Sequence, residues 1–431
     1  MDLIKKLEKI WKDNTDPFLI HPKGSFFFND ILEVKTIDFS QITEGKVVAL
    51  IGDYDPTTIS IFFKLINLNS IVVPLTLQTK ANHQSLFEIA CVDIIIKNGI
   101  VKTRIHNKKS KLIEVLKKKK SPGLIAFTSG TSGEPKAILH DFNTFLKRFE
   151  TPRPNLRTIN FLMFDHVGGL NTLFHTLFNK GVVIVPENRS VTSILDACEQ
   201  YQAEVLPTTP TFLRMMLISG LIPKSISKSI KVITYGSERM DNHTLNELCD
   251  LLPNVDFRQT FGTSELGVVR VKSKSRRSLF IKIGDLGLET KIEKNILYLR
   301  SKNRMLGYLN SPSPFDEDGW YNTKDVVEVN DEYFKIVGRV GEVINVGGLK
   351  FMASEVEKVA INFKNIEFVK VFSIPNPISG SHVEIKIQMK KNTKLDMNDY
   401  KKYMKKNLPA HMVPQKFSTG KIEVGNRFKR I

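Results

Sequence analysis

The stretch "LIAFTSGTSGEPKAILH", Leu124 to His140, joins a short apolar run to a polar loop. Residues 124–127 read Leu-Ile-Ala-Phe, which predicts a buried strand. The loop contains Gly130 and Gly133, which let the backbone approach a ligand closely. Its hydroxyl side chains and Lys136 supply hydrogen-bond donors and a positive charge. These are the groups that a phosphate-binding loop needs.

The spacing of this loop differs from that of a Walker phosphate loop. A Walker loop places its lysine directly after the second glycine. Here Glu134 and Pro135 separate Gly133 from Lys136. Clusters of Gly, Ser and Thr are also common in surface turns. The loop is therefore a polar turn or a phosphate loop of another kind, and the rest of the chain has to decide.

The composition is that of a globular protein. The chain has 431 residues, of which 41% are hydrophobic and 25% charged, and this length suggests two or three domains. No apolar run approaches the roughly 20 residues of a membrane-spanning helix. The amphipathic start, "MDLIKKLEKIWKDN", lacks the apolar core of a secretory signal. Cys91, Cys198 and Cys249 are far apart, so no disulfide framework or metal cluster is predicted, and we expect a cytoplasmic protein.

The net charge of +18 is high, and about half of the excess lies in residues 341–431, which hold 17 Lys or Arg against 8 Asp or Glu. Such a charge suits nucleic acid, anionic lipid or phosphorylated substrates. No RNA-binding signature, helix-turn-helix pattern or zinc spacing accompanies the lysines. We therefore expect no nucleic-acid partner.

The order of apolar segments predicts an α/β fold with two domains. Residues 46–75 read as strand, helix and strand, which is the unit of a parallel sheet. After about Ile283 the pattern changes to short strands, and the last 90 or so residues read as helix, strand, strand and helix. We predict a large N-terminal domain of parallel-rich sheets packed with helices over 1–338. A small α+β domain follows over 339–431, after the glycine-rich "VGRVGEVINVGG", which marks a hinge.

Two further stretches carry chemistry. In "RQTFGTSELGVV", Arg258 to Val269, the ring of Phe261 could lie flat against a planar base. Ser264 is a hydroxyl donor for a phosphate, and Glu265 offers the carboxylate oxygen that Mg²⁺ prefers. Upstream, the turn Gly236–Glu238 follows a predicted strand, at the sheet edge where ligands bind in open parallel sheets.

Two charged residues near the predicted domain boundary complete the set. Asp325, in "YNTKD", is an acceptor for ribose hydroxyls, and Arg339, in "VGRVG", is a cation close to it in sequence. Taken alone, each of these residues is more often an ordinary surface charge. Their order along the chain is what gives them weight.

In this order the motifs resemble those of the adenylate-forming superfamily, which includes acyl-CoA synthetases, adenylation domains of nonribosomal peptide synthetases and beetle luciferases. "TSGTSGEPK" is similar to the phosphate loop of that superfamily, and "FGTSE" to its aromatic-Gly-x-Thr-Glu motif, with Ser264 in place of threonine. "YNTKD" resembles its Tyr-x-Thr-Gly-Asp motif. "GRVGEVINVGGLKFMASEVE" resembles its hinge, and "VGNRFKRI" its terminal lysine motif. The resemblance covers roughly Lys46 to the C-terminus. It implies that the first subdomain, about 1–120, is shorter than usual and that the small C-terminal domain is mobile.

The resemblance implies a ligase that works in two steps. A carboxylic acid attacks the α-phosphorus of Mg²⁺-bound ATP to give acyl-AMP and pyrophosphate. A thiol then displaces AMP, and the thiol belongs to CoA or to the phosphopantetheine of an acidic acyl carrier protein. An amine acceptor and an inactive ATP-binding homologue are the alternatives. The oligomeric state is expected to be monomer or homodimer.

The resemblance also implies site residues. The ATP-binding set is Thr128, Ser129, Gly130, Thr131, Ser132, Gly133, Lys136, Gly236, Ser237, Glu238, Phe261, Gly262, Thr263, Asp325 and Arg339. Lys136 is expected mainly to support the phosphate loop. The catalytic set is Lys429, His166, Ser264 and Glu265, with Glu265 as the metal ligand. Lys429 is expected to bridge the carboxylate and the α-phosphate during adenylation only, and Lys421 is its rival.

The acyl pocket is expected at His166, Gly168, Gly169 and Gly267. His166 either gates this pocket or is a capping or core histidine. The surrounding sequence is mostly apolar, which favours an aryl or short-to-medium acyl acid, although Asp165 leaves an amino acid open.

The sequence departs from the superfamily pattern at two motif positions. Gly341 stands at the hinge, where the superfamily usually has Asp or Lys. Lys324 replaces the glycine that precedes the ribose-binding aspartate.

Overall fold

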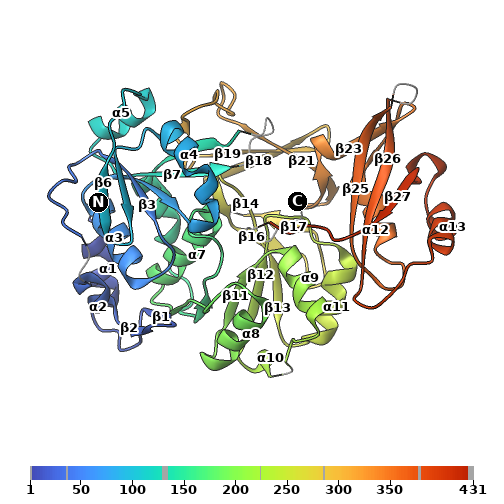
Figure 1. Cartoon of the computed structure of the whole chain (residues 1–431), viewed down its shortest axis with the longest axis horizontal. Helices are drawn as coiled ribbons and strands as arrows, with labels where there is room; N and C mark the ends of the chain where they lie inside the picture. Colours follow the sequence, from blue (N-terminus) through green and yellow to red (C-terminus); the bar gives the residue numbers. More distant parts are fainter. Residues whose placement is uncertain are drawn as a thin grey trace.

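The computed structural model describes residues 2–34, 37–128, 134–223, 225–284, 287–376 and 380–425. It is built of mixed sheets with helices on their faces, which confirms the predicted α/β class (Figure 1). The α-helices are α1 (Leu3–Trp11), α2 (Phe28–Glu33), α3 (Pro56–Asn67), α4 (His83–Ala90), α5 (Lys111–Lys118), α6 (Phe142–Leu146), α7 (Val167–Phe178), α8 (Val191–Gln200), α9 (Pro210–Ser219), α10 (Ile226–Ser229), α11 (Asn242–Leu251), α12 (Ala353–Ala360) and α13 (Met397–Asn407).

A first seven-stranded sheet contains the predicted strand–helix–strand unit of residues 46–75. In spatial order its strands are β20 (Gly307–Tyr308), β8 (Lys136–Asp141), β7 (Gly123–Thr128), β4 (Ile71–Leu75), β3 (Val47–Ile51), β5 (Ile94–Lys97) and β6 (Ile100–Thr103). Strands β3 and β4 are parallel, and every residue of both is buried because helices cover the sheet. Asp55 caps α3 by accepting hydrogen bonds from two backbone amides, and Pro56 occupies its first turn. The predicted strand at 124–127 is β7.

A second seven-stranded sheet lies beside the first and supplies the other half of the large core (Figure 1). Its strands, in order, are β13 (Asp256–Gln259), β12 (Val232–Tyr235), β11 (Val205–Thr208), β9 (Thr158–Ile159), β10 (Val183–Ile184), β1 (Leu19–His21) and β2 (Gly24–Phe26). Strands β9 to β13 pair in parallel, so their carboxyl ends meet at one edge. That edge is where open α/β sheets bind ligands.

The remaining strands form a hairpin and two smaller sheets. The hairpin is β14 (Phe261–Thr263) and β15 (Gly267–Val269). The six-stranded sheet is β16 (Val271–Ser273), β17 (Ile281–Ile283), β22 (Tyr333–Arg339), β21 (Tyr321–Asn330), β19 (Ile296–Ser301) and β18 (Leu288–Glu293). The C-terminal sheet is β24 (Leu349–Met352), β23 (Val343–Val346), β26 (Gly380–Met389) and β25 (Ile366–Asn376), with β27 (Lys416–Thr419) on β26.

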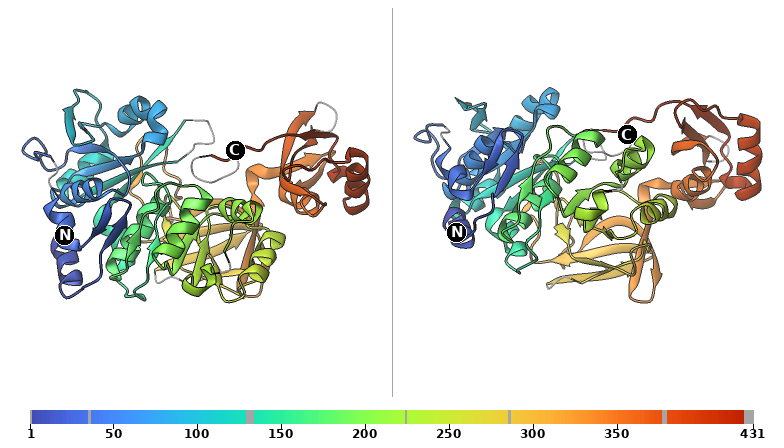
Figure 2. Two further views of the ribbon diagram at one scale, coloured as in Figure 1. Left: turned by 60° about the horizontal axis from the view of Figure 1, so that its bottom comes forward. Right: turned by 90° about the horizontal axis from the view of Figure 1, so that it is seen from below.

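The C-terminal sheet and its helices α12 and α13 lie at one end of the molecule (Figures 1 and 2). Their order confirms the predicted helix, strand, strand and helix of the last 90 residues. A single 3₁₀ turn at 340–342 leads from β22 into β23. After β27, the chain over 420–425 runs back toward the middle of the molecule (Figure 2). The 338/339 domain boundary, the short first subdomain and the mobility of the small domain stay predictions.

Among the helices described, none has both the length and the apolar character required to cross a membrane.

Candidate active site

A cleft of about 590 Å³ lies where the parallel sheets, the hairpin and the six-stranded sheet meet the C-terminal sheet. Its wall is formed by the end of β7, the start of α7, the turns after β12 and β13, and parts of β21, β22, α12 and β25. Of the predicted site residues, those that line it are Thr128, His166, Gly168, Ser237, Glu238, Phe261, Gly262, Thr263, Ser264, Glu265, Asp325 and Arg339. Residues spread over more than 200 positions of sequence therefore face one cavity.

The remaining predicted residues fall into two groups. Ser129, Gly130, Thr131, Ser132, Gly133 and Lys429 lie outside the described residues. The described residues that do not line the cleft are Lys136, Gly169, Gly236, Gly267 and Gly341. Most of these five residues pack against neighbours of the cleft residues and do not face the cleft themselves.

The turn after β12 needs glycine because it passes close to the turn after β13. A Cβ atom on Gly236 would lie 2.1 Å from Thr260 Oγ1 and 2.8 Å from the Thr260 carbonyl oxygen. The amide of Thr260 donates to the Tyr235 carbonyl at 2.7 Å, which fixes that approach. Ser237 and Glu238, which follow Gly236, line the cleft together with Phe261.

The hairpin of β14 and β15 presents the Phe261–Glu265 motif. Phe261 is 7% exposed, packs with Leu266 and Val269, and is one of the residues that line the cleft. A Cβ on Gly262 would lie 2.6 Å from the Gly267 carbonyl oxygen, so the two strands approach at a distance that only glycine permits. Stacking of Phe261 on adenine stays a prediction.

Glu265 is a buried carboxylate at the tip of this hairpin. It is 7% exposed, and its Oε1 accepts a hydrogen bond of 2.6 Å from the hydroxyl of Tyr308 on β20. Burial and the Glu265 charge raise the pKa of Tyr308, and the same two causes raise the pKa of Tyr321 on β21. Both phenols therefore stay protonated and are donors beside this carboxylate. Sequence reasoning missed Tyr308 and Tyr321.

The predicted ribose site is an ion pair between neighbouring strands. Asp325 is 6% exposed, and its Oδ1 accepts from Arg339 Nε at 3.0 Å across β21 and β22. Burial raises the pKa of Asp325, and the Arg339 guanidinium opposes that shift. Lys324 has a φ of +60°, the left-handed conformation that glycine adopts without strain. This backbone conformation explains why the resemblance leads one to expect glycine here. A lysine in this conformation lowers the stability of the fold by about 1 kcal/mol.

His166 is both a helix cap and part of the cleft wall. Its Nδ1 accepts a hydrogen bond of 3.1 Å from the Gly168 amide at the start of α7. When the ring is neutral its proton is therefore on Nε2. The capping alternative is confirmed, and gating of an acyl pocket stays a prediction.

Asp165, next to His166, is held in a separate buried cluster. Its Oδ2 accepts from Thr76 Oγ1 at 3.2 Å, and the residue is 5% exposed. It is not among the residues that line the cleft. This placement disfavours a role for Asp165 as counter-ion to an ammonium group in the substrate.

Gly168 and Gly169 have different surroundings at the start of α7. A Cβ on Gly169 would lie 2.3 Å from Tyr54 Oη and 2.4 Å from the Met163 carbonyl oxygen, whereas one on Gly168 would meet only the His166 ring, at 3.1 Å. We expect Gly169→Ala to lower the free energy of unfolding by about 1–3 kcal/mol, the usual cost of overpacking. Gly168→Ala is the matched control and should change it by less than about 1 kcal/mol. Urea denaturation of both variants checks this, and equal losses would contradict it.

Gly267, predicted in the acyl pocket, packs against Arg148, and its place in that pocket stays a prediction. It has a φ of +76°, and a Cβ there would overlap the Arg148 guanidinium. Gly341, in the 3₁₀ turn after β22, has open space around its Cβ direction. A role as hinge stays a prediction.

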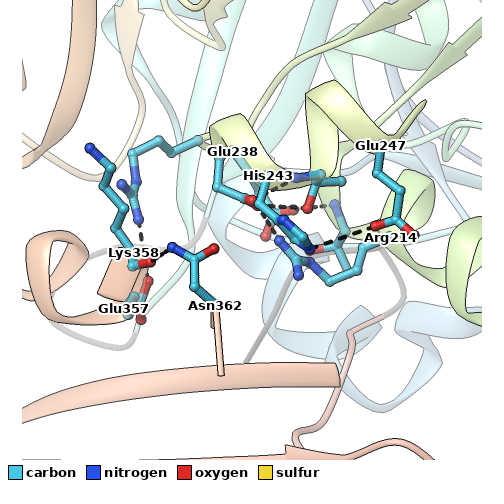
Figure 3. A network of polar contacts seen from close by, with 11 residues as sticks. Arg214, Glu238, His243, Glu247, Glu357, Lys358 and Asn362 are labelled. Atoms are coloured by element: carbon cyan, nitrogen blue, oxygen red, sulfur yellow. Dashed lines mark hydrogen bonds and ion pairs between the residues drawn. The ribbon is translucent and has the colours of Figure 1, made fainter. Parts of the chain in front are cut away.

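The C-terminal sheet contacts the cleft through a polar network that the sequence did not reveal (Figure 3). Arg239, beside Glu238, pairs with Glu357 of α12 at 3.3 Å, and the other oxygen of Glu357 accepts from the Val371 amide at 3.1 Å. Nearby, Arg214 pairs with Asp241 and lies over the ring of Phe368 on β25. In the sequence, Glu357 resembles any solvent-facing charge on a short helix.

The carboxylate chemistry of the cleft is suited to a metal ion that enters with a nucleotide. No group of three or more His, Cys, Asp or Glu side chains that could hold a metal occurs in the described parts of the chain. Mg²⁺ in nucleotide sites commonly takes one or two carboxylates and completes its shell with phosphate oxygens and water. Glu265 offers one such carboxylate, so the residues present fit Mg²⁺-bound ATP as the substrate.

Comparison with known proteins decides the family. A sequence model of the family described as AMP-binding enzyme matches residues 42–292, which is more than half of the chain. The chain belongs to the AMP-binding enzyme family.

This AMP-binding enzyme has curated relatives named as ligases. It is 26% identical over 320 residues to 4-coumarate-CoA ligase 1 of Narcissus pseudonarcissus, with 66% of this chain and 58% of the relative covered. It is 24% identical over 307 residues to the medium/long-chain-fatty-acid–acyl-carrier-protein ligase FadD10 of Mycobacterium tuberculosis, with 62% and 56% covered. The chain thus spans a little over half the length of these relatives.

Solved structures of adenylate-forming enzymes share the fold of this AMP-binding enzyme over nearly its whole length. The anthranilate CoA ligase AuaEII, in complex with anthranoyl-AMP, has a TM-score of 0.78 at 14% identity, with 97% of this chain and 93% of that chain covered. The amide bond synthetase McbA of Marinactinospora thermotolerans has a TM-score of 0.74 at 16% identity, with 98% and 97% covered. At these identities the likeness concerns the fold alone.

Proposed function

We propose that this enzyme condenses a carboxylic acid with Mg²⁺-bound ATP to give acyl-AMP and pyrophosphate, and then transfers the acyl group to a thiol. In the first step a carboxylate oxygen forms a bond to the α-phosphorus, and the bond from that phosphorus to the pyrophosphate oxygen breaks. In the second step the thiol sulfur attacks the acyl carbon, AMP leaves, and the thiol proton goes to solvent. The acceptor is CoA or the phosphopantetheine of an acyl carrier protein.

One observation carries this proposal, namely the gathering of twelve predicted site residues around one cleft. Asp325 would bind the ribose, Phe261 would lie against the adenine, and Glu265 would meet the metal of Mg²⁺-bound ATP. Thr128 stands at the start of the predicted phosphate loop. The reaction brings two anions together, so donors and cations placed in advance are what the site has to supply.

The acid-binding part of the cleft favours an uncharged acyl group. Next to His166 in sequence, Val167 and Gly168 line the cleft, and so does Val268 of β15, which contacts α7; these three residues are apolar or lack a side chain. Asp165 is held by Thr76 in another cluster. An aryl or short-to-medium acyl acid therefore fits better than an amino acid.

The acceptor class has two candidates. The C-terminal region carries much of the net positive charge, which suits the phosphates of CoA or an acidic carrier protein. The amide bond synthetase among the structural neighbours keeps an amine acceptor as the second candidate.

The first test is carboxylate-dependent exchange of radiolabelled pyrophosphate into ATP over a panel of aryl, short-chain and medium-chain acids. The proposal expects exchange with at least one acid, and products with CoA, an acidic carrier protein and a simple amine are then identified by mass spectrometry. Thioester formation supports the thiol acceptor, and an amide product supports the alternative. No exchange with any acid, in an enzyme that binds ATP, would identify an inactive ATP-binding homologue.

The Asp325–Arg339 pair gives a second prediction. We expect Asp325→Asn to raise the KM for ATP by about 10-fold or more, because a buried charged acceptor for the ribose hydroxyls is lost. The KM for the acid should stay within about twofold. Steady-state kinetics of the variant measure both, with Asp331→Asn, in the exposed turn between β21 and β22, as the control. An unchanged KM for ATP would remove Asp325 from the nucleotide site.

A further inference from the structure

The turn that bears Ser264 and Glu265 is held from behind by residues outside the cleft wall. The Ser264 carbonyl oxygen accepts from His140 Nε2 at 2.8 Å, and the Glu265 carbonyl oxygen accepts from the Met305 amide at 2.8 Å. Burial and the charge of Arg148 lower the pKa of His140 to about 3, so this histidine is a neutral donor at ordinary pH. The backbone of the turn is therefore fixed independently of its side chains.

The Glu265 side chain is held by a different contact, the 2.6 Å hydrogen bond from Tyr308. A hydrogen bond to a buried carboxylate is short and roughly twice as strong as one between neutral groups. It leaves the carboxylate one preferred orientation in the wall of the cleft, with Tyr321 as a second donor beside it.

Tyr308 is tied in turn to the end of the predicted phosphate loop. The ammonium of Lys136 lies 5.1 Å from the centre of the Tyr308 ring, and β20 pairs with β8 so that Tyr308 is opposite Ile138. Asn310 binds the backbone on both sides of Lys136. Its side chain donates to the Pro135 carbonyl at 2.9 Å and accepts from the Ala137 amide at 3.0 Å. The segment 305–310 thus bridges the loop end and the Glu265 turn.

We propose that Tyr308 is a positioning residue that orients the Glu265 carboxylate toward the metal of Mg²⁺-bound ATP, and that Lys136 acts by packing on Tyr308 and not by touching the nucleotide. This proposal rests on the proposed function, because it concerns how the same site receives the same substrate. Lys136 is the last residue of "TSGTSGEPK" and does not line the cleft. A role in packing on Tyr308 is consistent with that position.

The test measures nucleotide binding with and without metal and needs no turnover. A fluorescent, non-hydrolysable ATP analogue is titrated into wild-type enzyme and Tyr308→Phe, once with excess Mg²⁺ and once with EDTA. We expect Tyr308→Phe to weaken binding of the Mg²⁺ complex by about 10-fold and to leave binding of the metal-free analogue within about twofold. Electron paramagnetic resonance of Mn²⁺ with the analogue should show the same loss of bound metal.

Lys136 is tested in a double-mutant cycle. Lys136→Met, which keeps the length of the chain without the charge, should produce a smaller loss in the same direction. The losses of Lys136→Met and Tyr308→Phe should be less than additive, because both act through Glu265. If Lys136 contacts the phosphates directly, its substitution will weaken binding of the metal-free analogue and the two losses will add, which overturns this part of the proposal.

A second lysine–tyrosine pair gives the matched control. Lys274 lies 5.6 Å from the ring of Tyr333 at the far end of β22, and neither residue lines the cleft. Tyr333→Phe and Lys274→Met should leave both titrations unchanged.

The outcomes separate the two proposals. A wild-type enzyme that binds neither form of the analogue contradicts the proposed function. A wild-type enzyme that binds the Mg²⁺ complex normally, together with a Tyr308→Phe variant that binds it equally well, overturns only the role of Tyr308. Equal weakening of both forms, accompanied by a lower melting temperature, shows a merely structural role and also overturns it.

Discussion

Replacement of Lys429 by alanine is expected to lower the rate of acyl-adenylate formation by about 10²-fold or more, the scale of losing a positioned electrostatic group. The charge of this lysine would neutralise the carboxylate and the α-phosphate as they approach. Release of the acyl group from preformed acyl-AMP to a thiol should be almost unaffected. Rapid-quench measurement of the two half-reactions checks this difference.

The choice between Lys429 and Lys421 concerns the end of the C-terminal segment. Residues 420–425 run back toward the middle of the molecule (Figure 2), and Lys429, four positions after Gly425, lies outside the described residues. Lys421→Ala is the control, because that lysine is exposed and close in sequence. A selective loss of adenylation in Lys421→Ala, with Lys429→Ala active, would reverse the assignment. Equal losses in both half-reactions would argue against a lysine that serves one step only.

Glu265→Gln should also have a large effect, with a loss of about 10²-fold in pyrophosphate exchange. The amide keeps the size of the side chain and can still accept from Tyr308, but it lacks the negative charge that a bound divalent cation requires. The Mg²⁺ concentration that gives half-maximal rate should rise at the same time. Initial rates at varied Mg²⁺ and fixed ATP measure both quantities.

The control for this variant is Glu289→Gln, on the exposed strand β18. Glu289 pairs with Arg300 on the surface, and such pairs contribute little to stability. Its Mg²⁺ dependence should match that of the wild type. If Glu265→Gln loses rate without any change in its Mg²⁺ requirement, then the carboxylate acts on something other than the metal.

The sequence predicted those parts of the fold in which local pattern and burial agree. The run Val47–Ile51 is buried on both faces. Asp55 and Pro56 are typical residues of a helix start, and α3 begins there. Strand β7 was identifiable for the same reason. Pairings between distant segments carry no such signal, and nothing in the two residues Gly307–Tyr308 indicates that they complete the edge of the first sheet.

The sequence likewise predicted some residues of the site and not others. Residues that face the cleft belong to motifs with characteristic spacing, so Phe261, Glu265 and Asp325 could be selected from the sequence. The residues that hold them could not be, because their contacts join segments that are 43 positions apart for Tyr308 and Glu265 and 124 apart for His140 and Ser264. A buried histidine and a tyrosine on a two-residue strand look like ordinary core residues until the chain is folded.

The position of β20 at the outer edge of the first sheet has a consequence for folding during synthesis. Strand β8 has its outer neighbour only once residues 307–308 have been made, about 170 positions after β8 itself. Until then the nascent chain exposes the unpaired backbone groups of Lys136–Asp141, which form an edge prone to association with other chains. Truncation before about residue 310 should therefore give an aggregation-prone product even though most of the first sheet is present.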